Sequence, residues 1–241
     1  MTGPSLVAEN LSLIRSGREI FQVDRLALHK GEVLAMVGPN GAGKTSLLLT
    51  LALLQAPTAG NIFFDGVIAG NGNVLSLRRR MAIVFQDALL LDTTVFRNLM
   101  IPLRIRGVPK DEAAERAKKW LSLLRIDHLA GRKARHLSGG EAQRASLARA
   151  FALEPEFLFL DEPLGSLDYP TRKALLGELR QILKDMNMTT LFVTHDFTEI
   201  PYLASMVAVL YEGRMVKYGT IRQVFGEELL ESKAWTPWEV D

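Results

Sequence analysis

One short stretch of the sequence, GPNGAGKT at 38–45, combines glycines with a lysine and a hydroxyl residue. It follows an apolar run and opens a helical one, which is the context that a phosphate-binding loop requires. Glycines there let backbone N–H groups converge on phosphate oxygens at a helix N-terminus. Lys44 adds a charge for the β and γ phosphates, and the Thr45 hydroxyl can ligate Mg²⁺. The predicted triphosphate-binding residues are Gly38, Pro39, Asn40, Gly41, Ala42, Gly43, Lys44, Thr45 and Ser46.

A second candidate for phosphate chemistry is the stretch FLFLDEP at 157–163. The apolar run 157–160 predicts a buried strand, and open α/β sheets bind ligands at the carboxyl ends of their strands. Asp161 is expected to hold Mg²⁺, mostly through water. Glu162 is expected to accept a proton from, or to orient, the water that attacks the γ phosphate. Alone, the two acids are typical of a solvated strand end or a helix cap; together with a phosphate loop they indicate hydrolysis.

The stretch LSGGEAQR at 137–144 contains another glycine-rich helix start. Ser138 and Glu141 form an S-x-x-E capping box, so the simplest interpretation is a well-capped helix. A capping box does not need Gly139 and Gly140, and glycine costs up to about 1 kcal/mol in a helix interior. Bare amides at an exposed helix N-terminus favour an anion. Because the phosphate loop already holds its own triphosphate, we expect this site to face the nucleotide of another copy in a head-to-tail pair.

The composition excludes several classes of protein. Lys and Arg number 29 against 27 Asp and Glu, and the net charge of +2 gives no electrostatic reason to expect nucleic acid or an anionic membrane surface. The absence of cysteine excludes disulfides and thiolate metal sites, which fits a reducing compartment. The longest apolar run, 47–54, is far shorter than the roughly 18 residues of a membrane span, and the N-terminus lacks signal-peptide features. We therefore expect a soluble protein that is not exported.

Short apolar runs alternate with helical patterns along the chain, which is typical of an α/β fold. The runs 33–37, 157–160 and 190–194 predict buried parallel strands, because they are apolar throughout rather than alternating. Antiparallel pieces near the edges are predicted at 61–66, 206–211 and 214–218. Between about 92 and 155 the pattern is helical, and one helix carries an apolar stripe made of Ala113, Ala117, Trp120, Leu121 and Leu124.

Six stretches together resemble the ATP-binding cassette (ABC) ATPases in order and spacing. They are GPNGAGKT, LSGGEAQR, FLFLDEP, IVFQD with Gln86, GSLD at 165–168 and VTHD at 193–196, and the resemblance covers about residues 5–225. It implies a single domain with a P-loop NTPase core, whose mixed sheet has parallel central strands and an antiparallel edge, and an inserted helical subdomain. The core is expected at about 1–91 and 156–225, the helical subdomain at about 92–155, and a short tail at 226–241.

The resemblance also implies roles for single residues. Gln86 touches Mg²⁺ or its water and links the nucleotide to a membrane-spanning partner, and His195 contacts the γ phosphate. Asp168 lies in the loop that crosses to the other subunit, where the segment 138–141 closes over the opposite ATP. Taken singly, Gln86 also fits a solvated strand end, and His195 a helix cap. The expected catalytic residues are Lys44, Gln86, Glu162 and His195, and the expected metal ligands are Thr45, Gln86 and Asp161.

Two positions depart from the pattern of the family. The family usually stacks an aromatic residue on adenine, and the corresponding position here is Arg15. A guanidinium plane can also stack on a base, although Arg15 fits a solvated turn before Gly17 equally well. The signature carries Glu141 where glutamine is common. Both residues complete a capping box, so we expect little change from the second departure.

The sequence resembles cassettes that work as separate subunits of membrane importers. The implied cofactors are ATP and Mg²⁺. The implied partners are a second copy or a paralogous ATPase, transmembrane permease subunits and, indirectly, a substrate-binding protein, at the cytoplasmic side of the cell membrane. The segment after Gln86 and the stretch 164–172 are similar to importers of oxyanions such as tungstate or molybdate. The alternatives are a soluble cassette acting in translation or DNA repair, and a regulatory module without turnover.

Overall fold

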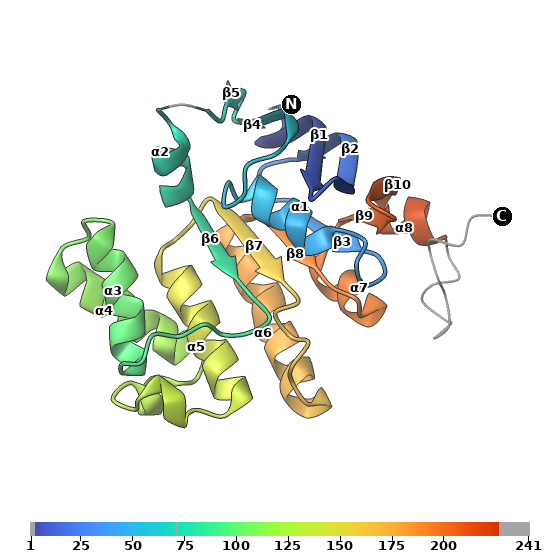
Figure 1. Ribbon diagram of the computed structural model, residues 1–241. Coiled ribbons are helices and arrows are strands. Elements are labelled where there is room, and N and C mark those ends of the chain that lie inside the picture. Colours follow the sequence, from blue (N-terminus) through green and yellow to red (C-terminus); the bar gives the residue numbers. More distant parts are fainter. Residues whose placement is uncertain (1–2, 71, 227–241) are drawn as a thin grey trace.

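The structure is a computed structural model that describes residues 3–70 and 72–226, so the predicted tail lies outside the described residues except for Gly226. Its described strands form one sheet in the order β5-β4-β1-β2-β10-β9-β3-β8-β7-β6 (Figure 1). The strands are β1 (Leu6–Arg15), β2 (Arg18–Leu28), β3 (Val33–Val37), β4 (Ala59–Phe64), β5 (Val67–Ile68), β6 (Met81–Val84), β7 (Phe157–Asp161), β8 (Thr189–Val193), β9 (Met206–Tyr211) and β10 (Arg214–Thr220).

Helices cover both faces of this sheet. The α-helices are α1 (Lys44–Leu51), α2 (Val74–Arg79), α3 (Val95–Ile105), α4 (Lys110–Leu123), α5 (Gly139–Ala152), α6 (Tyr169–Met186), α7 (Ile200–Leu203) and α8 (Ile221–Phe225). The described residues also form three short 3-10 helices: η1 (Asp127–Leu129), η2 (Ala134–His136) and η3 (Phe197–Glu199). No helix within residues 3–70 and 72–226 has both the length and the apolar character that a membrane crossing requires.

The centre of the sheet is parallel and buried on both faces. Strands β9, β3, β8, β7 and β6 pair in parallel. In β3, Leu34 and Met36 enter one apolar cluster, whereas Ala35 and Val37 enter the cluster on the opposite face. Alternate side chains of a strand point to opposite faces, so a strand covered on both sides has to be apolar throughout. The prediction of buried parallel strands from continuous apolar runs is confirmed.

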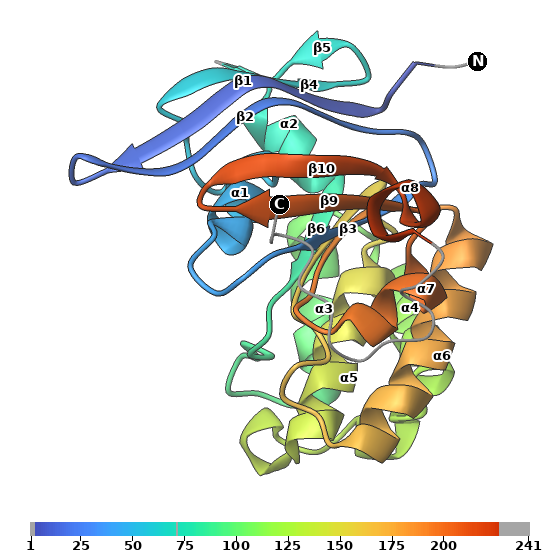
Figure 2. The same cartoon turned by 90° about the vertical axis from the view of Figure 1, so that its right-hand side faces the viewer.

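The antiparallel part of the sheet curls over helix α1 (Figure 2). It consists of the β1–β2 hairpin, β4 and β5, which pair antiparallel with one another. Leu48 of α1 is buried in the same apolar cluster as Phe21 of β2 and Phe64 of β4. Helix α1 therefore lies between the antiparallel strands and one face of the parallel centre, and this packing fixes the loop that precedes it.

The hairpin β9–β10 corrects the sequence analysis, which placed it near an edge. The two strands are antiparallel as predicted, but they lie in the middle of the sheet. Strand β9 pairs in parallel with β3, and β10 meets β2 at the single register pair Arg214 and Gln22. The hairpin thus joins the parallel centre to the antiparallel part. Burial of the whole run 207–210 agrees with this central place.

Helices α3, α4 and α5 gather at one end of the molecule (Figure 1). The predicted apolar stripe of α4 is buried, and Trp120, with 1% exposure, stacks on Phe151 of α5 with 5.1 Å between the ring centroids. The same cluster continues to Leu158 and Leu160 of β7. The inserted helices therefore share one apolar core with a face of the sheet, which fixes α5 relative to the strand that ends at Asp161.

Candidate functional site

The loop between β3 and α1 has a backbone that side chains would obstruct. A Cβ at Gly38 would lie 2.0 Å from the carbonyl oxygen of Leu210, so β9 can pass closely only because residue 38 is glycine. Gly43 precedes α1 with a φ of +96°, a conformation that glycine adopts without strain. No side chain caps α1, and its first turn carries no acidic residue. The first N–H groups of α1 are therefore available to an anion.

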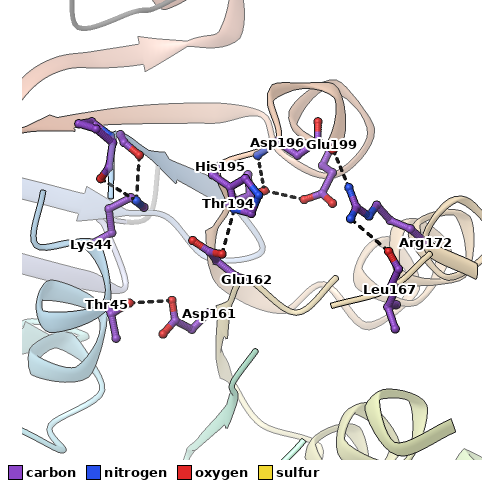
Figure 3. A network of polar contacts seen from close by, with 12 residues as sticks. Lys44, Thr45, Asp161, Glu162, Leu167, Arg172, Thr194, His195, Asp196 and Glu199 are labelled. Carbon is purple, nitrogen blue, oxygen red and sulfur yellow. Dashed lines mark hydrogen bonds and ion pairs between the residues drawn. The ribbon is translucent and has the colours of Figure 1, made fainter. Parts of the chain in front are cut away.

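Lys44 is buried at 6% exposure beneath this loop. Its Nζ donates to the carbonyl oxygens of Gly38 and Pro39 at 2.8 and 3.0 Å (Figure 3). Burial lowers the pKa of Lys44, and the charges of Glu162 and Asp161 act in the opposite direction. The ammonium is thus held inside the curve of the loop by two carbonyl groups and two nearby carboxylates, where it can accept a phosphate as a further partner.

Thr45 and Asp161 bring two oxygen donors together from different elements. The Thr45 hydroxyl, in the first turn of α1, donates to Asp161 Oδ1 at 3.1 Å. Asp161 ends β7 and is buried; burial raises its pKa, whereas the hydrogen bond from Thr45 lowers it. A buried carboxylate with so few partners is costly unless a cation or several donors satisfy it. Two of the three predicted metal ligands, Thr45 and Asp161, are therefore in direct contact.

Glu162 directly follows Asp161 in a backbone conformation that is unusual for a residue with a side chain. Its φ is +46°, and its N–H donates to the carbonyl oxygen of Val193 at 2.9 Å. Such conformations cost on the order of 1–3 kcal/mol and are concentrated at functional sites. The turn brings Glu162 Oε2 to 2.9 Å from His195 Nδ1 (Figure 3). The predicted general base and the predicted γ-phosphate residue are thus in direct contact.

A cavity of about 490 Å³ lies between the phosphate loop, Gln86 and the pair of Glu162 and His195. It is lined by Gly38, Pro39, Asn40, Gln86, Glu162 and His195. Gln86 follows β6, and Gly165 lies beside it: a Cβ at residue 165 would come within 3.3 Å of Gln86 Nε2 and 3.6 Å of Glu162 Oε2. The absence of a side chain at Gly165 leaves room for both groups, a feature that the sequence analysis did not identify.

The donor set fits magnesium. Mg²⁺ prefers oxygen ligands and keeps several waters, so one or two carboxylates, a hydroxyl and substrate phosphates are sufficient. Thr45, Asp161 and the Gln86 amide supply oxygens of these kinds. Residues 3–70 and 72–226 hold no group of three or more His, Cys, Asp or Glu side chains that could bind a metal alone. An ion in this place would take its remaining ligands from phosphate and water.

The second glycine-rich helix start has the predicted capping box. Ser138 N donates to Glu141 Oε2 at 2.7 Å, and Glu141 N donates to Ser138 Oγ at 3.4 Å. The hydrogen bonds from the backbone and hydroxyl of Ser138 lower the pKa of Glu141. A Cβ at Gly140 would press on Thr171 at 3.1 Å, whereas a Cβ at Gly139 would meet nothing within 4 Å. Packing therefore explains Gly140, but it does not explain Gly139.

The signature lines a different cavity from the phosphate loop. Its volume is about 780 Å³, and its lining includes the segments 138–141 and 166–168. No residue of the phosphate loop lines it. Asp168 is exposed at this cavity and caps α6 by accepting from Thr171 N at 3.1 Å. The structure therefore brings Asp168 to the signature and keeps both apart from the chain's own phosphate loop.

Arg15 lies outside the cavity that the phosphate loop lines. It ends β1 at the turn of the β1–β2 hairpin, and its Nη2 donates to Gln55 Oε1 at 2.7 Å. Ser46 continues α1 directly after Thr45. The structure thus brings together Lys44, Thr45, Gln86, Asp161, Glu162 and His195, and it places Arg15 at the hairpin turn instead.

Several residues that support this arrangement were missed from the sequence. Gln143 Nε2 donates to the carbonyl oxygen of Phe85 at 3.1 Å, and Arg149 Nη2 donates to that of Ala88 at the same distance. Both side chains belong to α5, so the signature helix holds the backbone on either side of Gln86. The sequence places these residues in the helix, but their loop partners lie about sixty positions away.

Comparison with known proteins identifies the class of fold. Residues 21–165 match the family profile described as ABC transporter. A solved dimeric cassette, MJ0796 in a post-hydrolysis state with ADP and phosphate, superposes with a TM-score of 0.80 at 26% identity, covering 90% of this chain and 99% of that one.

Curated relatives are import ATP-binding proteins with different named substrates. A molybdate/tungstate protein, WtpC of Thermococcus kodakarensis, is 40% identical over 86% of this chain and 63% of its own length. A sulfate/thiosulfate protein, CysA of Caulobacter vibrioides, is 43% identical over 83% and 60%. A spermidine/putrescine protein, PotA of Legionella pneumophila, is 36% identical over 93% and 62%. The chain thus spans somewhat more than half the length of these relatives.

Proposed function

Since the chain belongs to the ABC transporter family, we propose that it binds MgATP between two copies of itself and hydrolyses it to drive import through separate membrane subunits. The observation that carries this proposal is that the phosphate loop meets the carboxyl ends of the parallel strands β7 and β8. Lys44 and Thr45 come from the phosphate loop, Asp161 and Glu162 from the end of β7, and His195 from the end of β8.

Each of these side chains has a distinct task. The phosphate loop binds the triphosphate through its N–H groups, and Lys44 neutralises the β and γ phosphates. Thr45, Asp161 and Gln86 would hold a magnesium ion, which would supply charge neutralisation at the transferred phosphoryl group. Glu162 accepts a proton from the attacking water, and His195 holds both the Glu162 carboxylate and the γ phosphate in place.

The signature completes the site of the other copy. Gly139 has an open N-terminal helix position for which packing offers no reason, and the cavity beside it excludes the phosphate loop of the same chain. An anion there has to be supplied by another molecule. The dimeric state of the solved cassette with ADP and phosphate supports a head-to-tail pair with two shared nucleotides.

A membrane partner is supported by exposed apolar side chains in the part of the sequence that follows Gln86. Leu89 and Leu91 follow Gln86, and Ile101 and Ile105 lie four residues apart on one face of α3; all four are exposed. Apolar side chains that gather on a surface are typical of interaction sites. We infer that permease subunits dock here, which places the protein peripherally at the cytoplasmic side of the membrane and connects it only indirectly to a substrate-binding protein.

The proposed cargo is an oxyanion such as molybdate or tungstate. Support comes from the segment after Gln86, which resembles oxyanion importers, and from the named substrates of two relatives. The spermidine/putrescine relative carries a different name at similar identity. The cargo contacts the permease and not the cassette, so identifying the permease decides this point.

The test is co-purification of the tagged chain from membranes of its own cells, followed by mass spectrometry. A permease and an oxyanion-binding protein are expected in the complex. Ile105→Glu places a charge on the proposed docking face and should release the permease. Leu75→Glu, at an exposed leucine of α2, is the matched control; Ile105 and Leu75 are 74% and 64% exposed. If the chain hydrolyses ATP but neither variant nor parent recovers a membrane protein, the import function is wrong while the ATPase assignment stands.

A further inference from the structure

Arg172, in the first turn of α6, joins two loops of the candidate site through one guanidinium group. Its Nη1 donates to Asp196 Oδ2 at 3.0 Å, and its Nη2 donates to the carbonyl oxygen of Leu167 at 3.2 Å (Figure 3). Asp196 directly follows His195, and Leu167 directly precedes Asp168. The loop that carries the proposed γ-phosphate residue and the loop that faces the second copy are therefore held by the same side chain.

The residues on both sides of His195 are fixed by side chains rather than by a regular element. Asp196 N donates to Thr194 Oγ1 at 3.0 Å, and the Thr194 hydroxyl donates to Glu199 Oε2 at 2.6 Å. Asp196 Oδ1 accepts from the N–H and the hydroxyl of Thr198 at 2.9 and 2.6 Å. The backbone of His195 is thus held between two anchored neighbours, and Arg172 is the link from these anchors to Leu167.

This arrangement is costly for stability, which indicates a role other than folding. Glu199 is a carboxylate with only 3% exposure. The Arg172 Nε is buried and has no hydrogen-bond partner in the described part of the chain. Buried polar atoms without full sets of partners are destabilising, and apolar replacements of similar shape are often neutral or better. An apolar side chain would fill the position of Arg172 but could not bridge Asp196 and Leu167.

We propose that Arg172 is a positioning residue that couples the two nucleotide sites of the dimer. This inference rests on the proposed function, because it takes His195 as the γ-phosphate residue and the Asp168 loop as the contact with the second copy. When a second copy docks on the Asp168 loop, it fixes Leu167. Through Arg172 and Asp196 this holds His195 beside Glu162, so hydrolysis in one site depends on closure of the interface. Neither Arg172 nor Asp196 lines the cavity beside the phosphate loop.

The primary test compares Arg172→Met with Arg180→Met in steady-state ATP hydrolysis. Arg180 lies on the exposed side of α6, so its variant controls for loss of a charge from the same helix. For Arg172→Met we expect unchanged ATP affinity, about tenfold to a hundredfold lower kcat, and a Hill coefficient for ATP that falls to about 1. Arg172→Lys can reach one partner but not both, and should recover part of kcat without recovering cooperativity. Parent values for kcat and Hill coefficient in Arg172→Met would overturn the inference.

A double-mutant cycle excludes a merely structural effect. Asp196→Asn removes the charge that faces Arg172 but keeps an oxygen for the cap to Thr198. If the two residues act through one contact, Arg172→Met in the Asp196→Asn background lowers kcat no further. Independent, multiplying losses would contradict the coupling. His195→Ala distinguishes failure of the proposed function from failure of the coupling. Parent-like hydrolysis in His195→Ala would contradict the proposed role of His195. Loss of hydrolysis in His195→Ala together with parent-like hydrolysis in Arg172→Met would overturn only the coupling.

Discussion

His195 Nδ1 and Glu162 Oε2 lie 2.9 Å apart, although the two residues are 33 positions apart in the sequence. They meet because β7 and β8 are parallel neighbours whose register pairs Asp161 with Val193, so both strands end at the same edge of the sheet. The N–H of Glu162 donates to the carbonyl oxygen of Val193, which holds the two strand ends together. Glu162, the proposed proton acceptor, and His195, the proposed γ-phosphate residue, are therefore in direct contact.

Replacement of this acid separates binding from hydrolysis. Glu162→Gln keeps the size and one oxygen of the side chain but removes the proton acceptor. We expect MgATP affinity close to that of the parent, hydrolysis lower by about a hundredfold or more, and an ATP-dependent dimer in size-exclusion chromatography. Turnover near the parent level in this variant would rule out Glu162 as the general base.

Lys44→Ala is expected to weaken nucleotide binding itself. It removes the buried ammonium that lies between the loop carbonyl groups and the two carboxylates. Charge-assisted hydrogen bonds contribute about 1.5–3 kcal/mol, so ATP affinity measured by calorimetry should fall about tenfold to a hundredfold. Lys173→Ala, at an exposed position of α6, is the control for a change of net charge. Equal affinities for the two variants would contradict the role of Lys44.

The buried carboxyl of Glu199 predicts a pH dependence of stability. Burial raises its pKa above the value in the unfolded chain. The contribution of Glu199 is therefore fully favourable below the unfolded pKa and is lost as the pH rises through the folded pKa. Glu199→Gln has no such titration. The pKa of a glutamate in the unfolded chain is about 4.3. The melting temperature of the parent minus that of Glu199→Gln should therefore decrease from pH 4 to pH 8. A difference that is flat or that increases with pH would contradict a raised pKa of Glu199 in the folded protein.

Arg15 is tested by two opposite replacements. If it stacks on adenine, Arg15→Tyr should bind ATP at least as well as the parent, and Arg15→Ala should lose affinity and some preference for ATP over GTP. Stacking on a base contributes about 1–3 kcal/mol, which is about fivefold to a hundredfold in affinity. Gln55→Ala removes only the hydrogen-bond partner of Arg15 and leaves its guanidinium plane in place, so we expect unchanged ATP affinity in this variant. If all three variants bind both nucleotides like the parent, Arg15 is a surface residue of the hairpin.

Gly139→Asp distinguishes a site in the same chain from a shared site. A Cβ at residue 139 would meet no atom within 4 Å, so the variant is expected to fold and its monomer to bind ATP normally. The added carboxylate would face the γ phosphate of the other copy and prevent closure by like-charge repulsion. Gly177→Asp, at another glycine in open space on α6, is the control. Loss of ATP affinity in the Gly139→Asp monomer would show that the glycines serve their own chain.

Mixing two inactive chains gives a further test of the shared site. In a head-to-tail pair of Gly139→Asp and Lys44→Ala chains, one composite site carries both changes and the other carries neither. The mixture is expected to regain part of the parent hydrolysis, while each variant alone stays inactive. The absence of any recovery, although mixed dimers are present in native mass spectrometry, would contradict the head-to-tail arrangement.

The phosphate loop, the acids after the apolar run 157–160 and the signature could be predicted from the sequence because their function depends on local backbone geometry, whereas Gln86, Asp168 and His195 were expected only from the resemblance to a family. A phosphate loop needs glycines, a lysine and a hydroxyl residue within eight positions, and the capping box at Ser138 needs only a spacing of three. The continuous apolar runs around Ala35 and Leu158 predicted a parallel sheet with both faces covered. In each case, chain neighbours or a simple period decide the structure, so the sequence pattern contains the information.

The tertiary structure alone decided which of these pieces meet. The central position of β9–β10 follows from pairing with β3 and β2, and a local pattern does not specify a strand's neighbours. Arg172 has the sequence pattern of an ordinary helix residue, and its partners Asp196 and Leu167 become visible only when α6 packs against α7. Long-range pairs of this kind arise when chain segments with large sequence separation are buried together, and no periodicity within one segment records them.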